Sequence, residues 1–99
     1  MTKHPAFERA VKIVQQCKLI NTRQIIGNWG SELIQLAYNN WAIDECLKRL
    51  NAHPEDPPLE IMEGFSSELD RYSMMSSHVS YAFSTAKDTV QWIIDMLVK

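Results

Sequence analysis

Residues that could hold a metal ion are few and widely spaced in this sequence. The chain contains three histidines and two cysteines: His4, His53, His78, Cys17 and Cys46. A structural zinc site needs four nitrogen or sulfur ligands at short spacings, and no two of these residues lie three or four positions apart. We therefore predict no metal centre. The cysteines fall on apolar helical faces, which is typical of small buried side chains in a reducing compartment.

A pair of carboxylates offers a second kind of chemistry. Glu60 and Glu63 form an ExxE pattern, which some all-α nucleotide pyrophosphohydrolases combine with a later ExxD to bind magnesium. The two later four-residue segments that could serve as the ExxD end at Asp88 and Asp95, but each begins with a residue other than Glu. Glu60 and Glu63 also fall opposite the apolar side of their predicted helix, whereas magnesium needs carboxylates that face one another. We interpret the pair as a solvated helix face and predict no cofactor.

Nucleophilic catalysis has no recognisable motif in the chain. The sequence contains no GxSxG turn, no GxxxxGK phosphate loop and no cysteine–histidine motif. We therefore expect a protein that is not an enzyme.

Nucleic-acid binding is an alternative function. Residues 5–38 could form two helices joined by a turn, as in a helix-turn-helix regulator. The second of these helices would read SELIQLAYNNWAIDE, which carries several acids and few bases, whereas phosphate contacts require Lys or Arg near helix ends. The formal net charge of −2 also disfavours binding to a polyanion. A DNA-associated regulator stays an alternative, and we expect no nucleic-acid partner.

Aromatic residues outside the predicted core stripes are the most informative feature. In the last helical segment Tyr81 and Trp92 fall about 180° from the apolar stripe, and Asp88 shares their side. Ile34 and Trp41 fall on a second apolar stripe of the preceding helix. Because Tyr and Trp are enriched at interface hot spots, these five residues are our candidate protein interface. In the alternative interpretation, Trp92 packs internally against the N-terminal helix.

The helices that would position these residues follow from the apolar spacing. A first helix is predicted over residues 5–20, with Asn21 and Thr22 at its end. A second helix is predicted over 31–50, and its spacing continues back to residue 22 if the helix runs through the glycines. Its main stripe consists of Ile26, Trp29, Leu33, Leu36, Asn40, Ile43, Leu47 and Leu50. Its second stripe consists of Gly27, Gly30, Ile34, Ala37 and Trp41. We expect both stripes to be buried in the first half of this helix.

Asn40 is a polar residue within the main stripe. A buried Asn at such a position can fix helix register or oligomer number at some cost in stability. Alternatively, the helix bends at Asn39 and Asn40 and a new segment begins there, whose early acids and late bases suit the helix dipole. Both interpretations stay open.

The last segment, residues 59–98, follows a proline-rich turn at 52–58. Its apolar residues alternate steps of three and four without a phase slip, which favours one long helix. The serines around Ser76 favour a break, because serine side chains compete for backbone hydrogen bonds. We predict an all-α fold: a short N-terminal helix plus a long antiparallel helical hairpin, or a four-helix bundle if the chain breaks near Ser76.

Length and composition limit the remaining possibilities. The 99 residues suit one domain over 1–99, and the apolar fraction of 45% argues against disorder. We expect a cytoplasmic protein without membrane contact, because the first residues are charged and no apolar run reaches the roughly 18 residues of a membrane span. We predict a small, self-associating protein–protein interaction module, such as an inhibitor or immunity-type protein. A small-ligand-binding helical oligomer is a further alternative.

Overall fold

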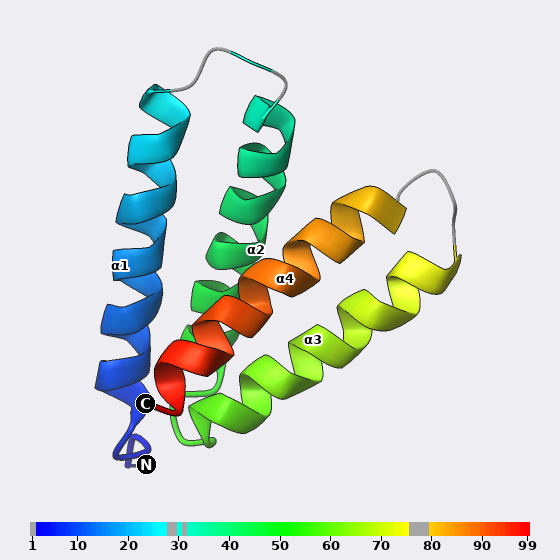
Figure 1. The fold of residues 1–99 in the computed structure, drawn as a ribbon. Helices are drawn as coiled ribbons and strands as arrows, with labels where there is room; N and C mark the ends of the chain where they lie inside the picture. Colours follow the sequence, from blue (N-terminus) through cyan, green and yellow to red (C-terminus); the bar gives the residue numbers. More distant parts are fainter. Residues whose placement is uncertain (1, 28–29, 31, 76–79) are drawn as a thin grey trace.

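The computed structural model describes residues 2–27, 30, 32–75 and 80–99 of the chain. Within these residues it contains four α-helices and no strand: α1 (Phe7–Ile26), α2 (Glu32–Ala52), α3 (Pro58–Met75) and α4 (Ser80–Leu97). Helices α1 and α2 lie side by side as one antiparallel hairpin, and α3 and α4 form a second (Figure 1). Helix α4 packs on α2 and also contacts α1, whereas α3 packs mainly on α4. The predicted all-α fold is confirmed.

The two hairpins meet at one end of the molecule, where both termini lie (Figure 1). The backbone N–H of His4 donates to the carbonyl of Pro54 at 2.8 Å, which ties the N-terminal residues to the turn between α2 and α3. The Arg9 guanidinium donates to the carbonyls of Leu97 and Lys99, each at 2.9 Å. These contacts join the two hairpins at the end of the molecule where the termini lie. The opposite ends of the two hairpins diverge.

One cluster of buried side chains from all four helices forms the core. In α1 and α3 the buried residues recur at steps of three and four, which places them on one helical face. They are Phe7, Ala10, Val14, Cys17 and Asn21 in α1, and Pro58, Met62, Phe65 and Leu69 in α3. The core residues of α2 and α4 are Ala42, Ile43, Cys46, Leu50, Ala86, Val90 and Ile93. Burying a large apolar side chain stabilises the fold by about 1.5–3 kcal/mol.

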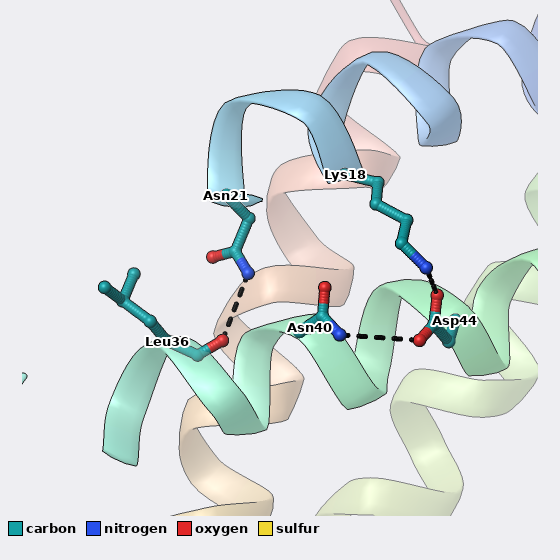
Figure 2. A network of polar contacts seen from close by, with 5 residues as sticks. All are labelled: Lys18, Asn21, Leu36, Asn40 and Asp44. Atoms are coloured by element: carbon teal, nitrogen blue, oxygen red, sulfur yellow. Dashed lines mark hydrogen bonds and ion pairs between the residues drawn. The ribbon is translucent and has the colours of Figure 1, made fainter. Parts of the chain in front are cut away.

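The first helix is longer than predicted, since it begins at Phe7 and ends at Ile26. Asn21, which we expected at its end, lies inside the helix and is buried. Its side-chain amide donates to the backbone carbonyl of Leu36 in α2 at 3.1 Å (Figure 2). Because this partner belongs to another helix, the amide does not compete for the backbone of its own helix.

The second helix confirms the prediction for residues 31–50, since it spans Glu32–Ala52. The continuation back to residue 22 is wrong, because residues 22–26 belong to α1 and Ile26 is exposed at the end of that helix. Trp29, which the continuation would have buried, lies outside the described residues. The glycines therefore fall between two helices and do not pack inside one.

One face of α2 is buried and the neighbouring face is open. Leu36, Ile43 and Leu50 of the main stripe are buried, whereas Leu33, which we also expected to be buried, is exposed near the start of the helix. The predicted burial of the second stripe is wrong, because all of its members are exposed: Gly27, Gly30, Ile34, Ala37 and Trp41. Apolar spacing identifies a face that avoids water, but it does not tell whether this chain or another molecule covers that face.

Asn40 lies at the edge of the interface between α1 and α2. It is half-buried, and its amide lies 3.5 Å from the carboxylate of Asp44, which also pairs with Lys18 of α1 (Figure 2). Helix α2 runs without interruption past this position, so the predicted new segment at residues 39 and 40 is wrong. The buried amide that joins two helices is that of Asn21.

The last segment forms two helices, so the long continuous helix is wrong and the four-helix alternative is confirmed. Helix α3 ends at Met75 and α4 begins at Ser80, while the predicted break point, Ser76, lies outside the described residues. An unbroken stripe gives each half an apolar face, but it does not determine whether the halves continue in line or fold back. Folding back allows α3 and α4 to bury these faces against each other.

Candidate functional site

Aromatic side chains of α2 and α4 meet at the surface between the two hairpins. The rings of Tyr38 and Tyr81 lie 6.4 Å apart between centroids, at an interplanar angle of 70°. Those of Trp41 and Phe83 lie 6.5 Å apart at 69°. Both pairs have the edge-to-face geometry that the charge distribution of aromatic rings favours. The four residues therefore form an ordered contact between α2 and α4.

Helix α3 adds two aromatic residues, Phe65 and Tyr72, that contact this cluster. The ring of Trp41 lies 6.2 Å from that of Phe65, which is buried in the core. The ring of Tyr72 lies 5.4 Å from that of Phe83. The core thus fixes the inner edges of Trp41 and Phe83, and the outer rings rest on them.

A hollow opens to solvent within the cluster. It is lined by Tyr38, Trp41, Ala82 and Phe83, has a volume of about 390 Å³, and is almost wholly apolar. Around it Trp41, Tyr72 and Tyr81 keep 44%, 45% and 59% of their surface exposed. We call Tyr38, Trp41, Tyr72, Tyr81 and Phe83 the aromatic patch. Contiguous apolar patches of this kind on a soluble protein mark binding surfaces more often than scattered exposed residues do.

The structure brings three of the five candidate interface residues together. Trp41 and Tyr81 belong to the aromatic patch, and Ile34 lies one turn before Tyr38 on the same exposed face of α2. Asp88 is exposed, but it lies about 10 Å along α4 from Tyr81. Trp92 is half-buried and packs against the core, which agrees with the interpretation that it is internal.

Sequence reasoning missed Tyr38, Tyr72 and Phe83 as members of the site. Tyr38 could have been found, because Ile34, Tyr38 and Trp41 lie four and three residues apart and so share a helical face. Tyr72 and Phe83 belong to the apolar stripe of residues 59–98, which favoured one long helix. Their position on the surface follows from the return of α4 along α3, which the spacing does not encode.

Two basic side chains near the patch, Arg49 and Lys87, are paired within the chain. Arg49 lies over the Phe65 ring at 4.2 Å, and its guanidinium pairs with Glu68 at 2.9 Å and with Glu45 at 3.9 Å. Lys87, one turn along α4 from Phe83, pairs with Asp70 at 2.8 Å. The charges of Arg49 and Lys87 are therefore neutralised by acids of the same chain, and Arg71, next to Tyr72, is exposed.

The other candidate chemical groups lie away from the patch. Glu60 and Glu63 are exposed, as expected for a solvated face, and Asp88 is also exposed. In the turn after α2 the ligand atoms of His53, Glu55 and Asp56 lie within 4.8 Å of one another, and all three residues are exposed. Sequence reasoning missed this group because it compared histidines and cysteines alone.

Both cysteines are free and buried, as predicted. Burial raises the pKa of the Cys17 thiol and raises that of Cys46 to about 12. The thiols are therefore protonated at neutral pH, and a protonated thiol is a poor nucleophile.

The hairpin of α1 and α2 bears on the DNA-binding alternative. The two helices run alongside each other (Figure 1), whereas those of a helix-turn-helix motif cross at about 90–120°.

Within the described residues, no helix is both long enough and apolar enough to cross a lipid bilayer. Comparisons with protein-family models, curated proteins and solved structures find no match. Function is therefore inferred from the surface of this chain.

Proposed function

We propose that the protein is a non-enzymatic helical module that binds another protein through the aromatic patch. One observation carries this proposal: three helices each contribute a half-exposed aromatic side chain, Trp41, Tyr72 or Tyr81, that lines an apolar hollow or contacts a ring that lines it. Such residues dominate the energy of protein interfaces when a partner buries them. Trp41 contacts Phe65 of the core, Tyr72 contacts Phe83 and Tyr81 contacts Tyr38. These contacts hold the three rings in place before binding, which lowers the entropic cost of association.

The proposal includes self-association, and it includes an inhibitor or immunity-type role as one form of the module. Such proteins act by covering a surface of their target, for which an ordered apolar patch is suited. The cytoplasm is the proposed setting. The two free, buried cysteines support that setting, because free thiols persist in a reducing compartment.

A photo-crosslinking experiment tests the proposed function. A benzophenone amino acid replaces Tyr81 in one variant and Leu19 of α1 in a control variant, since the two side chains are almost equally exposed at 59% and 58%. We expect irradiation in an extract of the native host to give a discrete protein adduct from position 81 and none from position 19. Adding Trp41→Ser to the first variant should abolish the adduct. Equal labelling from both positions, or no adduct from position 81, contradicts the proposal.

A small-ligand role is a second candidate, supported by the volume of the hollow. At about 390 Å³ it falls in the range of small-molecule sites, roughly 300–1,000 Å³. This role predicts saturable binding of an apolar aromatic probe, one molecule per chain, with a change in tryptophan fluorescence that Trp41→Phe removes. Binding without saturation favours the protein-contact function instead.

A further inference from the structure

We infer that the aromatic patch binds the same patch of a second copy of this chain, so that the protein forms a symmetric dimer. This inference rests on the proposed function, because it names the partner of the same surface. In a two-fold dimer, each copy contributes the identical patch, so the patch must fit itself. The surface therefore needs a hollow and a protruding apolar group next to each other.

The aromatic patch contains both a hollow and a protruding apolar group. The hollow lies between Tyr38, Trp41, Ala82 and Phe83. Tyr81 protrudes beside it, because its ring contacts Tyr38 at the edge of the hollow and the residue is 59% exposed. In a two-fold arrangement Tyr81 of each copy can enter the hollow of the other.

Met75 of α3 adds a second exposed apolar side chain next to Tyr72 of the patch. It lies one turn beyond Tyr72 on α3 and is 79% exposed. Methionine is flexible and polarisable, so it fits irregular apolar surfaces and makes favourable contacts with aromatic rings. A facing copy of the patch supplies such rings.

The charges around the patch also favour a second copy over a charged partner. Arg49 pairs with Glu68, and Lys87 pairs with Asp70, within the chain. A surface that recognises a strongly acidic or basic partner carries unpaired charges of the opposite sign. Here two identical rims can approach without a large excess of like charge, and the apolar centre suits the composition of homodimer interfaces.

The exposed apolar area is of the size that a dimer needs. Trp41, Tyr72 and Tyr81, together with Ile34 and Met75, leave on the order of 500 Å² of apolar side chain in water. A stable interface buries about 800 Å² per partner. Roughly two-thirds of a homodimer interface is apolar, so this area suits the centre of such an interface.

Sedimentation velocity over a range of micromolar concentrations tests the inference. We expect the unmodified protein to reach about twice its 11.4 kDa monomer mass at the higher concentrations. Tyr81→Arg should weaken the dimer roughly a hundred-fold or more, because two-fold symmetry places the new charge at the interface twice. Met75→Arg is a second variant with the same expected direction. Leu19→Arg, an equally exposed apolar residue on α1, is the matched control and should sediment like the unmodified protein.

Circular dichroism establishes that each variant is folded, which we expect because all three side chains are exposed. A monomer at every concentration overturns the inference, and so does a Leu19→Arg protein that dissociates as readily as Tyr81→Arg. Dimers that persist in both patch variants also overturn it. A monomer whose position 81 crosslinks to a different protein rejects the second copy, and self-association with it, and retains the proposed binding of another protein through the patch. A monomer without any adduct from position 81 rejects both.

Discussion

Asn21 sets both the length of α1 and its pairing with α2. Its buried amide donates to the Leu36 carbonyl, so the helix continues through a residue that usually ends helices. The sequence predicted a helix end at this position because the hydrogen bonds that an asparagine can make with neighbouring residues can be anticipated from the sequence. A hydrogen bond to a carbonyl on another helix cannot be anticipated in this way. The candidate interface shows the same limit. Helical spacing placed Ile34, Trp41 and Tyr81 outside the main apolar stripes, but it did not reveal that Ile34 and Trp41 are exposed, and the contact between Tyr38 and Tyr81 depends on the packing of α4 on α2.

The Asn21 contact leads to a prediction for stability. We expect Asn21→Ala to lower the free energy of unfolding by about 1–2 kcal/mol, because it removes a buried interhelical hydrogen bond. Urea unfolding measures this change. Thr22→Ala is the matched control, since Thr22 is exposed and both substitutions raise helix propensity similarly. A loss no larger in Asn21→Ala than in Thr22→Ala would show that the hydrogen bond does not stabilise the fold.

At the scale of elements, the sequence predicted faces better than connections. The apolar spacing gave α2 almost to its observed bounds. The spacing of residues 59–98 correctly identified Met62, Phe65 and Leu69 of α3 and Ala86, Val90 and Ile93 of α4 as buried, but Tyr72 of the same stripe is exposed, and the spacing did not reveal that the chain folds back. Two helices with facing stripes and one long helix share the same pattern, so tertiary packing decides between them. The exposure of the second face of α2 was missed for a similar reason, because apolar spacing does not identify which molecule covers a face.

The end of α4 provides a prediction at this scale. The last carbonyls of a helix lack partners within the helix, and Arg9 of α1 supplies donors to Leu97 and Lys99. Its positive charge also lies favourably at the negative end of the helix dipole. We expect Arg9→Ala to cost about 0.5–1 kcal/mol and to speed hydrogen exchange in the last turn of α4. Lys12→Ala, which removes another exposed cation from α1, should leave this exchange unchanged. Equal effects of the two variants would contradict the role assigned to Arg9.

At the scale of the whole molecule, the two hairpins join firmly at one end and diverge at the other (Figure 1). The core cluster takes side chains from all four helices, yet Trp41, Tyr72 and Tyr81 keep about half of their surface in water. The molecule, 44 × 33 × 22 Å in extent, thus holds an ordered apolar surface between its hairpins. Removing apolar surface from water contributes about 25 cal/mol for each Å², and only the part that exceeds the entropic cost of association stabilises a complex. This gain is the physical basis of the proposed binding role.

Oxidative footprinting with hydroxyl radicals tests this role most directly, because it reports which side chains water reaches. Mass spectrometry would compare the dilute chain with the assembled state, formed at high concentration or with the crosslinked partner. We predict that Trp41, Met75 and Tyr81 are oxidised several-fold more slowly in the assembled state, while Leu19 and Ile26 of α1 react at unchanged rates. Unchanged oxidation of the patch residues in an assembled sample, or protection confined to α1, would contradict the claim that the aromatic patch is the binding surface.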